Sequence, residues 1–148
     1  MKKLFLLLAV VIVAYACSKD SSGDGKPSIA FRSYNMSEIP NPAPPIVVYL
    51  NLKDSDGDIE DRLFVRLNYF SDGGDTITYN FEPFNLPKLG SYRGSNINAT
   101  IEFRPNDTYL NPKENMPLDS VWFSMYVQDN AGNISDTIAT PRILIHGE

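Results

Sequence analysis

The residues best suited to chemistry lie in one acidic stretch of the chain, KDSDGDIEDR, at positions 53–62. Five carboxylates fall within eight consecutive positions there: Asp54, Asp56, Asp58, Glu60 and Asp61. Carboxylate oxygens are preferred ligands of hard cations, and Ca²⁺ takes about six to eight oxygens. In an extended turn the alternating Asp54, Asp56 and Asp58 would point to one side, and Gly57 would allow tight curvature. The stretch therefore predicts a structural Ca²⁺ site.

Two features separate this stretch from an EF-hand loop, whose first residues it resembles. The glycine comes one position before the third Asp, and Val65 rather than a Glu takes the twelfth position. The alternative to a cation site is a solvated turn, because Asp, Asn and Gly form turns in many contexts. Crowded negative charges repel one another unless water or a cation neutralises them, so both interpretations stay open.

Few residues of the chain are suited to catalysis. His146 is the only histidine and Cys17 the only cysteine. A Ser-His-Asp triad, a Cys-His pair or a zinc cluster would need more of these residue types. Glu82 and Glu102 remain as a glycosidase-like carboxylate pair, but carboxylates at strand ends are more often solvated. We predict a protein that is not an enzyme.

The elements that would carry these residues are β-strands. Apolar residues recur at a period of two, the spacing that buries one face of a strand. The first strand is predicted at 28–34 and the last at 137–145, where Pro141 indicates an edge or a bulge. Five further strands lie between them, at 46–53, 63–69, 77–81, 97–103 and 121–127. The predicted core residues include Leu50, Val65, Ile101 and Val127.

Seven strands without helical crossovers, in about 120 residues, favour a seven-stranded immunoglobulin-like β-sandwich. A small β-barrel is the competing architecture. In the sandwich, the loop after the second strand and the loop before the last strand lie at the same end. The acidic stretch is the first of these loops, and DNAGN, residues 129–133, is the second. Asp54, Asp56 and Asp58 are therefore the first-choice ligands. The cation shell is predicted to be completed by Glu60 or Asp61 and by Asp129, Asn130 or Asn133.

A second candidate site is a strip of aromatic residues. Trp122 and Tyr126 alternate with the apolar residues of one predicted strand, and Phe64 and Phe70 do the same on another. Since these two strands are neighbours in the sandwich, the four rings would share one sheet face. If that face is exposed, it predicts stacking on sugar rings or contact with a partner protein. If the inward and outward faces are reversed, the strip is the core and Trp122 is its central tryptophan.

The N-terminal residues indicate secretion. Two lysines precede an apolar run, Leu4–Val13, and the small residues Ala14 and Ala16 lead to Cys17. The run is too short to span a bilayer and has the organisation of a secretory signal. A cysteine at the cleavage point is similar to the signal of bacterial lipoproteins. Cys17 is therefore predicted to carry acyl chains such as palmitate that anchor the protein to a membrane.

On this interpretation the chain has three parts: a signal peptide at 1–16, a polar tether at 17–26 and one domain at 27–148. Loss of the signal leaves 11 basic and 18 acidic side chains, a net charge of −7. Without a basic patch that pairs with phosphates, we expect no binding to nucleic acid. The expected partners are the membrane, through the anchor, and a glycan or an envelope protein. The expected location is the outer membrane, on its periplasmic or its exposed side.

Two segments, LNLKDSDGDIEDRLFVRL and VWFSMYVQDNAGNISDTI, resemble the single cadherin-like or PKD-like modules of small surface lipoproteins from Bacteroidota. The resemblance covers about residues 46–145. It implies an immunoglobulin-like fold and a non-catalytic role, either binding a glycan or protein or acting as a spacer or accessory subunit of an outer-membrane complex. Three Asp-Ser/Thr-aliphatic triplets also resemble the O-glycosylation signal of these bacteria, which implies Thr76, Ser120 and Thr137 as acceptors.

Overall fold

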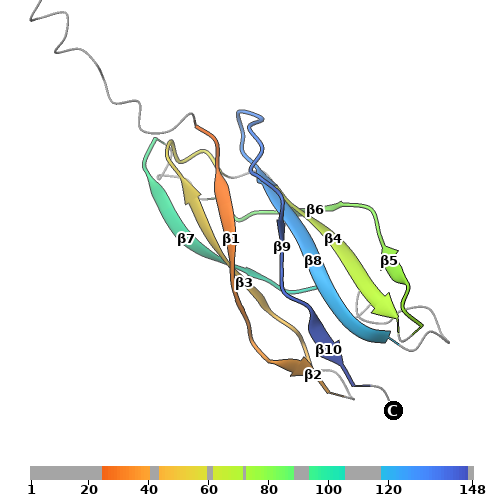
Figure 1. The fold of residues 1–148 in the computed structure, drawn as a ribbon. Helices are drawn as coiled ribbons and strands as arrows, with labels where there is room; N and C mark the ends of the chain where they lie inside the picture. Colours follow the sequence, from red (N-terminus) through yellow and green to blue (C-terminus); the bar gives the residue numbers. More distant parts are fainter. Residues whose placement is uncertain are drawn as a thin grey trace, which may run out of the picture.

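The computed structural model of the protein describes residues 25–40, 44–59, 62–71, 73–88, 94–105 and 118–146. In this part of the chain all regular elements are β-strands, arranged in two sheets (Figure 1). The sheets do not close into a barrel. The predicted β-sandwich is therefore confirmed and the competing small barrel is wrong. None of the described residues belongs to a helix long and apolar enough to cross a membrane.

The smaller sheet consists of three antiparallel strands: β1 (Ser28–Tyr34), β3 (Val48–Asp54) and β7 (Ile97–Phe103). β3 lies in the centre, where Leu50 pairs with Phe31 on one side and Ile101 on the other. Along β3 every second side chain, from Val48 to Asp54, is buried. This strand therefore supplies the central part of the inward face of the smaller sheet.

The larger sheet follows the order β2 (Glu38–Ile39), β10 (Ile143–Ile145), β8 (Leu118–Gln128), β4 (Arg62–Ser71) and β5 (Thr76–Thr78). In addition, β6 (Glu82–Asn85) pairs with β4, and β9 (Ile138–Ala139) pairs with β8. All these pairs are antiparallel except β2 with β10. β4 and β8 pair along nearly their whole length, so they form the rigid centre of this sheet.

The described part of the chain has ten strands rather than the seven predicted, and most of the predicted ones are present. The strands predicted at 28–34 and 97–103 are confirmed with the same bounds. The strand predicted at 137–145 divides around Pro141 into β9 and β10. The missing N–H of Pro141 had indicated such an interruption. The strand predicted at 77–81 is shorter, and the chain returns to β4 as β6. β2 was not predicted, because two residues carry no recognisable period.

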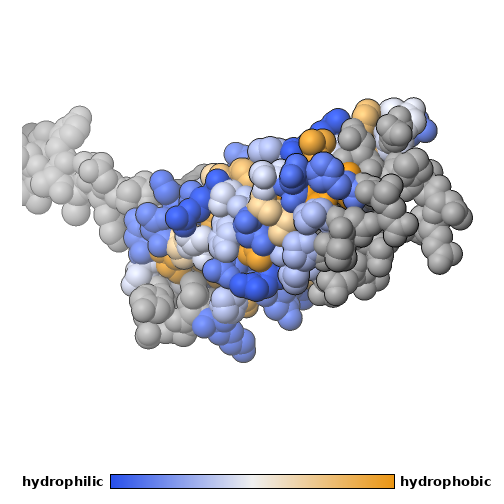
Figure 2. Space-filling model, turned by 90° about the horizontal axis from the view of Figure 1, so that it is seen from below, coloured by the Kyte–Doolittle hydropathy of each residue, from blue (hydrophilic) through white to orange (hydrophobic). Residues whose placement is uncertain are grey.

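The core lies between the two sheets. β8 contributes the buried side chains Val121, Phe123, Met125 and Val127. The ring of Phe123 meets the ring of Phe103 on β7 edge-on, with 6.0 Å between the ring centroids. The two sheets are therefore in direct contact through side chains. In the view of Figure 2, hydrophobic residues reach the surface only as small patches between hydrophilic ones.

Three of the four predicted core residues are buried: Leu50, Val65 and Val127. The prediction for Ile101 is only partly correct, because this side chain is half-buried. Ile101 lies on β7, an edge strand of the smaller sheet, where β3 pairs with it on one side only. An edge strand leaves part of its surface in water even when its sequence alternates.

Thr140 completes the hydrogen bonding of β8 where the last strand is interrupted. The N–H of Phe123 donates to Thr140 Oγ1 at 2.8 Å, and the N–H of Thr140 donates to the Phe123 carbonyl at 2.9 Å. The Tyr34 hydroxyl lies 2.6 Å from the same Oγ1 and 2.7 Å from the carbonyl oxygen of Pro141. A side-chain hydroxyl thus replaces the backbone carbonyl that a continuous strand would offer to β8.

Replacing Thr140 with valine keeps the shape of the side chain but removes this hydroxyl. We expect the free energy of unfolding to fall by about 1–3 kcal/mol, because the buried N–H of Phe123 loses its acceptor. Urea denaturation measures the change. Thr78→Val, at an exposed position of β5, is the matched control and should change stability by less than about 0.5 kcal/mol. Equal losses in the two variants would contradict the role assigned to Thr140.

Candidate metal site and aromatic sheet face

The acidic stretch forms the loop that follows β3. Asp54 is the last residue of β3, and Gly57 has a positive φ of 69°, the left-handed conformation that glycine adopts at low cost. The turn brings Asp54, Asp56 and Asp58 together, with one carboxylate oxygen from each within 4.8 Å of the others. The first-choice ligands of the sequence prediction therefore form one cluster. Glu60 and Asp61 lie outside the described residues.

Asp54 is the buried member of this cluster. It shares the inward side of β3 with Leu50 and Leu52, and only 2% of its surface is exposed. Its Oδ2 accepts a hydrogen bond from the N–H of Asp58 at 3.0 Å. Its Oδ1 is buried and has no hydrogen-bond partner among the residues that the structure describes. Such an oxygen is uncommon, because a buried polar atom without a partner costs free energy.

The cluster disfavours its own negative charge. Burial, and after it the charges of Asp56 and Asp58, raise the pKa of Asp54 above its usual value. Because this pKa is higher in the folded chain than in the unfolded one, ionised Asp54 lowers the stability of the fold at neutral pH. The cost begins to fall as the pH drops through the pKa of the folded chain, where Asp54 takes up a proton, and it is gone below the pKa of the unfolded chain. A bound cation would remove the same cost by neutralising the carboxylates.

Three distant segments of the chain contact the acidic loop. The N–H of Gly94 donates to the carbonyl of Asp56 at 2.6 Å, and the N–H of Asn130 donates to the carbonyl of Asp58 at 3.2 Å. A Cβ placed on Gly25 would lie 3.0 Å from Asp56 Oδ2, so the backbone of Gly25 packs directly against this carboxylate. The predicted meeting of the acidic loop with the loop before the last strand is confirmed.

Asp129 has a different role from the one that the sequence suggested. It is buried at the end of β8, and both of its carboxylate oxygens are bound within its own loop. Oδ1 accepts the N–H of Asn133 at 2.7 Å, and Oδ2 accepts the side-chain amide of Asn133 at 2.8 Å. Asp129 therefore closes the turn after β8 and is not part of the Asp54 cluster.

The two predicted asparagines contact neighbouring backbone. The amide of Asn133 donates to the Gly25 carbonyl at 3.4 Å, and Asn130, which is exposed, contributes its N–H to the carbonyl of Asp58. Sequence analysis did not identify Gly25 or Gly94 as neighbours of the acidic loop. No sequence signal pointed to them, because both are remote from residues 53–62 along the chain.

The aromatic strip lies on the outward face of the larger sheet. Trp122, Tyr126, Phe64 and Phe70 are all half-buried, while the residues between Trp122 and Tyr126 that face inward are fully buried. The side chains of Phe64 and Tyr126 are cross-strand neighbours, and their rings stack with 4.6 Å between centroids. The outward assignment is therefore correct, and Trp122 is not the central core tryptophan.

Two arginines that the sequence analysis did not single out join the rings. The guanidinium carbon of Arg142 lies 4.5 Å from the ring centroid of Trp122 and 4.6 Å from that of Phe70. Arg66 lies 4.6 Å from the ring of Phe81. Arg66 shares the outward period of β4 with Phe64 and Phe70, so its position could have been predicted. Arg142 could not, because its segment follows the interruption at Pro141.

The rings and arginines cover small polar residues in the middle of this face. Asn68 and Ser124 are buried although they point outward from β4 and β8. The Asn68 amide donates to Ser124 Oγ at 3.1 Å and lies 3.4 Å from the Trp122 carbonyl. The larger side chains around them exclude water from this pair. We refer to Phe64, Arg66, Phe70, Phe81, Trp122, Tyr126 and Arg142 together as the aromatic–arginine face.

The remaining predicted residues do not meet in a site. Glu82 is on β6 of the larger sheet and Glu102 on β7 of the smaller one, where it pairs with Arg104 at 3.0 Å. His146 lies 2.9 Å from Glu38. Among the glycosylation candidates, Thr76 and Thr137 are exposed, whereas Ser120 is buried and inaccessible on the folded domain. Cys17 lies outside the described residues.

Comparison with protein-family models, with curated proteins and with solved structures found no match to this chain. The resemblance to small surface lipoproteins therefore stays an expectation.

Proposed function

We propose that the protein is a non-catalytic, lipid-anchored module of the bacterial cell envelope that binds glycans with its aromatic–arginine face. The observation that carries this proposal is the outward position of Trp122 and Tyr126. These side chains alternate with the buried residues of β8, so the strand supplies the core on one side and a second ordered surface on the other. Aromatic surfaces that are not needed for the core commonly mark binding sites.

The chemistry of this face suits a sugar ligand. Ring edges and ring surfaces offer apolar contact to the C–H groups of a sugar, and the guanidinium groups of Arg66 and Arg142 donate hydrogen bonds to hydroxyl or carboxylate oxygens. The side chains are already packed against one another, at 4.6 Å for Phe64 with Tyr126 and 5.0 Å for Phe81 with Tyr126. Because they are ordered before a ligand arrives, binding loses little conformational entropy.

The direction of the chain supports an anchored arrangement. Gly25, where the described part of the chain begins, enters at the end of the sandwich that carries the acidic loop. β10, the last strand, lies at the opposite end (Figure 1). A tether attached through Gly25 would hold the sandwich by one end, with both sheet faces directed sideways. The aromatic–arginine face would then be accessible to a polymer running along the membrane.

A purely structural role is the second candidate, and one observation favours it. Arg142 covers the rings of Trp122 and Phe70, and the buried pair of Asn68 and Ser124 lies beneath the larger side chains. Cross-strand contacts of this kind stabilise a sheet without any ligand. On this view the domain is a spacer or an accessory subunit of an outer-membrane complex.

Titration with oligosaccharides separates the two candidates. Trp122 is the only tryptophan of the chain, so intrinsic fluorescence reports directly on this face. A glycan array with the purified protein supplies the oligosaccharide for the titration. We expect its binding to change the fluorescence and Tyr126→Ala to weaken the affinity about tenfold, the loss that corresponds to roughly 1.4 kcal/mol of ring contact.

The matched control is Tyr49→Ala, which removes a half-buried tyrosine from the outward side of β3 in the other sheet. This variant should bind as the unchanged protein does. If no oligosaccharide binds, or if the two variants lose affinity equally, the glycan proposal is wrong. Capture of an envelope protein by the intact face, abolished by Tyr126→Ala, would assign the same surface to a protein partner instead.

A further inference from the structure

We propose that Asp54, Asp56 and Asp58 bind one Ca²⁺ ion, and that this ion fixes the last residues of the N-terminal tether, Gly25 and Lys26, against the end of the sandwich. The inference does not rest on the proposed glycan binding, because the site lies on the loops at one end of the domain and not on a sheet face. It rests on two observations: the clustering of the three carboxylates, and the buried Oδ1 of Asp54, which has no hydrogen-bond partner among the described residues.

Comparison of two buried carboxylates in this protein points to a ligand at Asp54. Asp54 is the last residue of β3 and Asp129 directly follows the last residue of β8, and both are almost completely buried. Asp129 has hydrogen-bond donors for both oxygens, at 2.7 and 2.8 Å. Asp54 has a donor for Oδ2 alone, and its buried Oδ1 has none among the described residues. Within the described part of the chain, both oxygens of Asp129 are therefore satisfied, whereas Oδ1 of Asp54 is open to an external partner.

The surroundings favour a cation as that partner. Asp56 and Asp58 each bring a carboxylate oxygen within 4.8 Å of Asp54, so a negative ligand would add to the crowding of charge and a neutral one would leave it unrelieved. A divalent cation would neutralise the carboxylates and supply the missing interaction of Asp54 Oδ1 at once. The buried oxygen is thus explained by the same ion that removes the repulsion.

The ligand set fits Ca²⁺ better than Mg²⁺. The backbone carbonyls of Asp56 and Asp58 already accept hydrogen bonds from Gly94 and Asn130, so the carboxylates are the main protein ligands. Ca²⁺ accepts irregular shells completed by water, whereas Mg²⁺ demands a near-ideal octahedron. A loop with this few protein ligands is expected to bind weakly, with Kd in the extracellular range of about 10⁻⁴–10⁻³ M.

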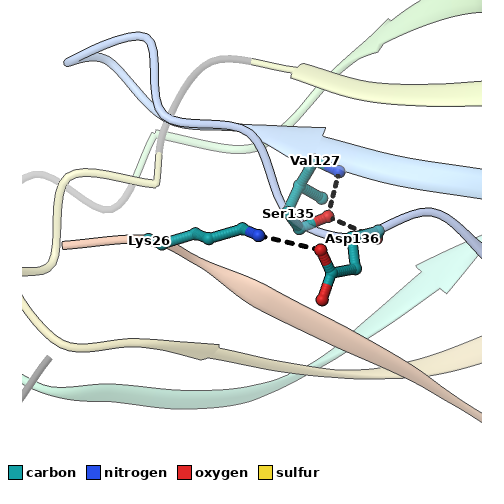
Figure 3. Close-up of polar contacts among 4 residues, drawn as sticks. All are labelled: Lys26, Val127, Ser135 and Asp136. Atoms are coloured by element: carbon teal, nitrogen blue, oxygen red, sulfur yellow. Dashed lines mark hydrogen bonds and ion pairs between the residues drawn. The ribbon is translucent and has the colours of Figure 1, made fainter. Parts of the chain in front are cut away.

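The tether joins the domain at this site. Gly25 packs against Asp56 Oδ2, and its carbonyl accepts the amide of Asn133 at 3.4 Å. Lys26 forms an ion pair with Asp136 at 2.8 Å, beside Ser135, whose Oγ accepts the N–H of Val127 (Figure 3). The Lys26 pair is exposed and so contributes little alone. An ion that holds Asp56 in place would fix the surface on which Gly25 rests.

Calorimetric titration of the chelator-treated protein with CaCl₂ tests the site. We expect one ion per chain, and a melting temperature that rises by roughly 5–10 °C at a hundred times Kd. Asp54→Asn should weaken Ca²⁺ binding at least tenfold. The same variant should melt above the unchanged protein in chelator, because the amide still accepts the N–H of Asp58 but carries no buried charge.

Two further variants test Ca²⁺ binding independently of Asp54→Asn. Asp56→Asn removes an exposed ligand, so it tests binding even if the substitution at the buried Asp54 prevents folding. Asp75→Asn removes an exposed carboxylate from a different turn and should leave the Ca²⁺ response unchanged. No heat and no melting shift up to about 10 mM CaCl₂, ten times the weak end of the expected range, would overturn the site. An equal response in Asp56→Asn and Asp75→Asn would do the same.

Hydrogen exchange tests the connection to the tether. With Ca²⁺ bound, the amides of Gly25 and Lys26 should exchange at least several-fold more slowly than in chelator, while the amides of β5, which is remote from the acidic loop in sequence and pairing, should not change. If Ca²⁺ binds but these two amides are unaffected, the ion does not fix the tether. That outcome, like the calorimetry, is independent of whether Tyr126→Ala affects glycan binding.

Discussion

Replacing Leu50 with alanine is expected to lower the free energy of unfolding by about 2–5 kcal/mol. Leu50 lies in the middle of β3, pairs with Phe31 and Ile101, and has 0% of its surface exposed. The substitution removes buried methyl groups and leaves a cavity between the sheets, because paired strands on both sides prevent collapse. Since a domain of this size has roughly 5–15 kcal/mol of stability in total, a large share would be lost.

Leu144→Ala is the matched control, with the same chemical change on the larger sheet. Leu144 lies on β10 with 51% of its surface exposed, so truncation there should cost less than about 1 kcal/mol. Urea denaturation of both variants measures the difference. A stability loss at Leu50 no greater than at Leu144 would show that β3 does not supply the core.

Replacing Cys17 with alanine is expected to move the protein from the membrane fraction to the soluble fraction. Our hypothesis is that Cys17 carries several acyl chains, and two or more chains give stable attachment where one gives only reversible binding. Fractionation of bacteria that process lipoproteins, followed by immunoblotting, measures the change. Mass spectrometry of the N-terminal peptide identifies the acyl chains directly.

Ser18→Ala is the control for this experiment, because it changes the adjacent residue and leaves the thiol. It should stay in the membrane fraction. An alanine variant at position 17 that remains membrane-bound, or an unmodified Cys17 in the unchanged protein, would exclude the lipid anchor. In that case residues 17–26 would not connect the domain to a membrane. The Ca²⁺ site would then only stabilise the loops at the end of the domain.

The two candidate sites lie on different parts of the domain, one at its end and one on its side. The acidic loop, Gly25 and the turn after β8 meet at the end where the described chain begins. The aromatic–arginine face lies along β4 and β8. If both proposals hold, the Ca²⁺ ion sets the orientation of the domain relative to its tether. The aromatic–arginine face then determines which ligand the domain binds. Removing Ca²⁺ should then change the orientation of the domain with little change in its affinity for a soluble glycan.

The sequence alone was sufficient for most of the longer strands and for the three carboxylates of the cluster. Period-two alternation depends only on the geometry of an extended chain, so β1 and β7 were predicted with their observed bounds. Asp54, Asp56 and Asp58 are close in sequence, and a glycine turn was enough to bring them together. The same period places Asp54 on the side of β3 that carries Leu50, so its burial was also implied by the sequence.

Only the tertiary structure decided which side of β8 faces the core and which residues surround the acidic loop. Alternation shows that Trp122 and Tyr126 share a face, but a strand turned over has the same period, and only packing against the other sheet makes one face inward. Likewise, Asp54 and Asp129 look equivalent in sequence, as acidic residues at the ends of strands. Their difference depends on whether a hydrogen-bond donor lies within reach, and that is a property of the assembled loops: Asn133 reaches both oxygens of Asp129, and no described residue reaches Asp54 Oδ1.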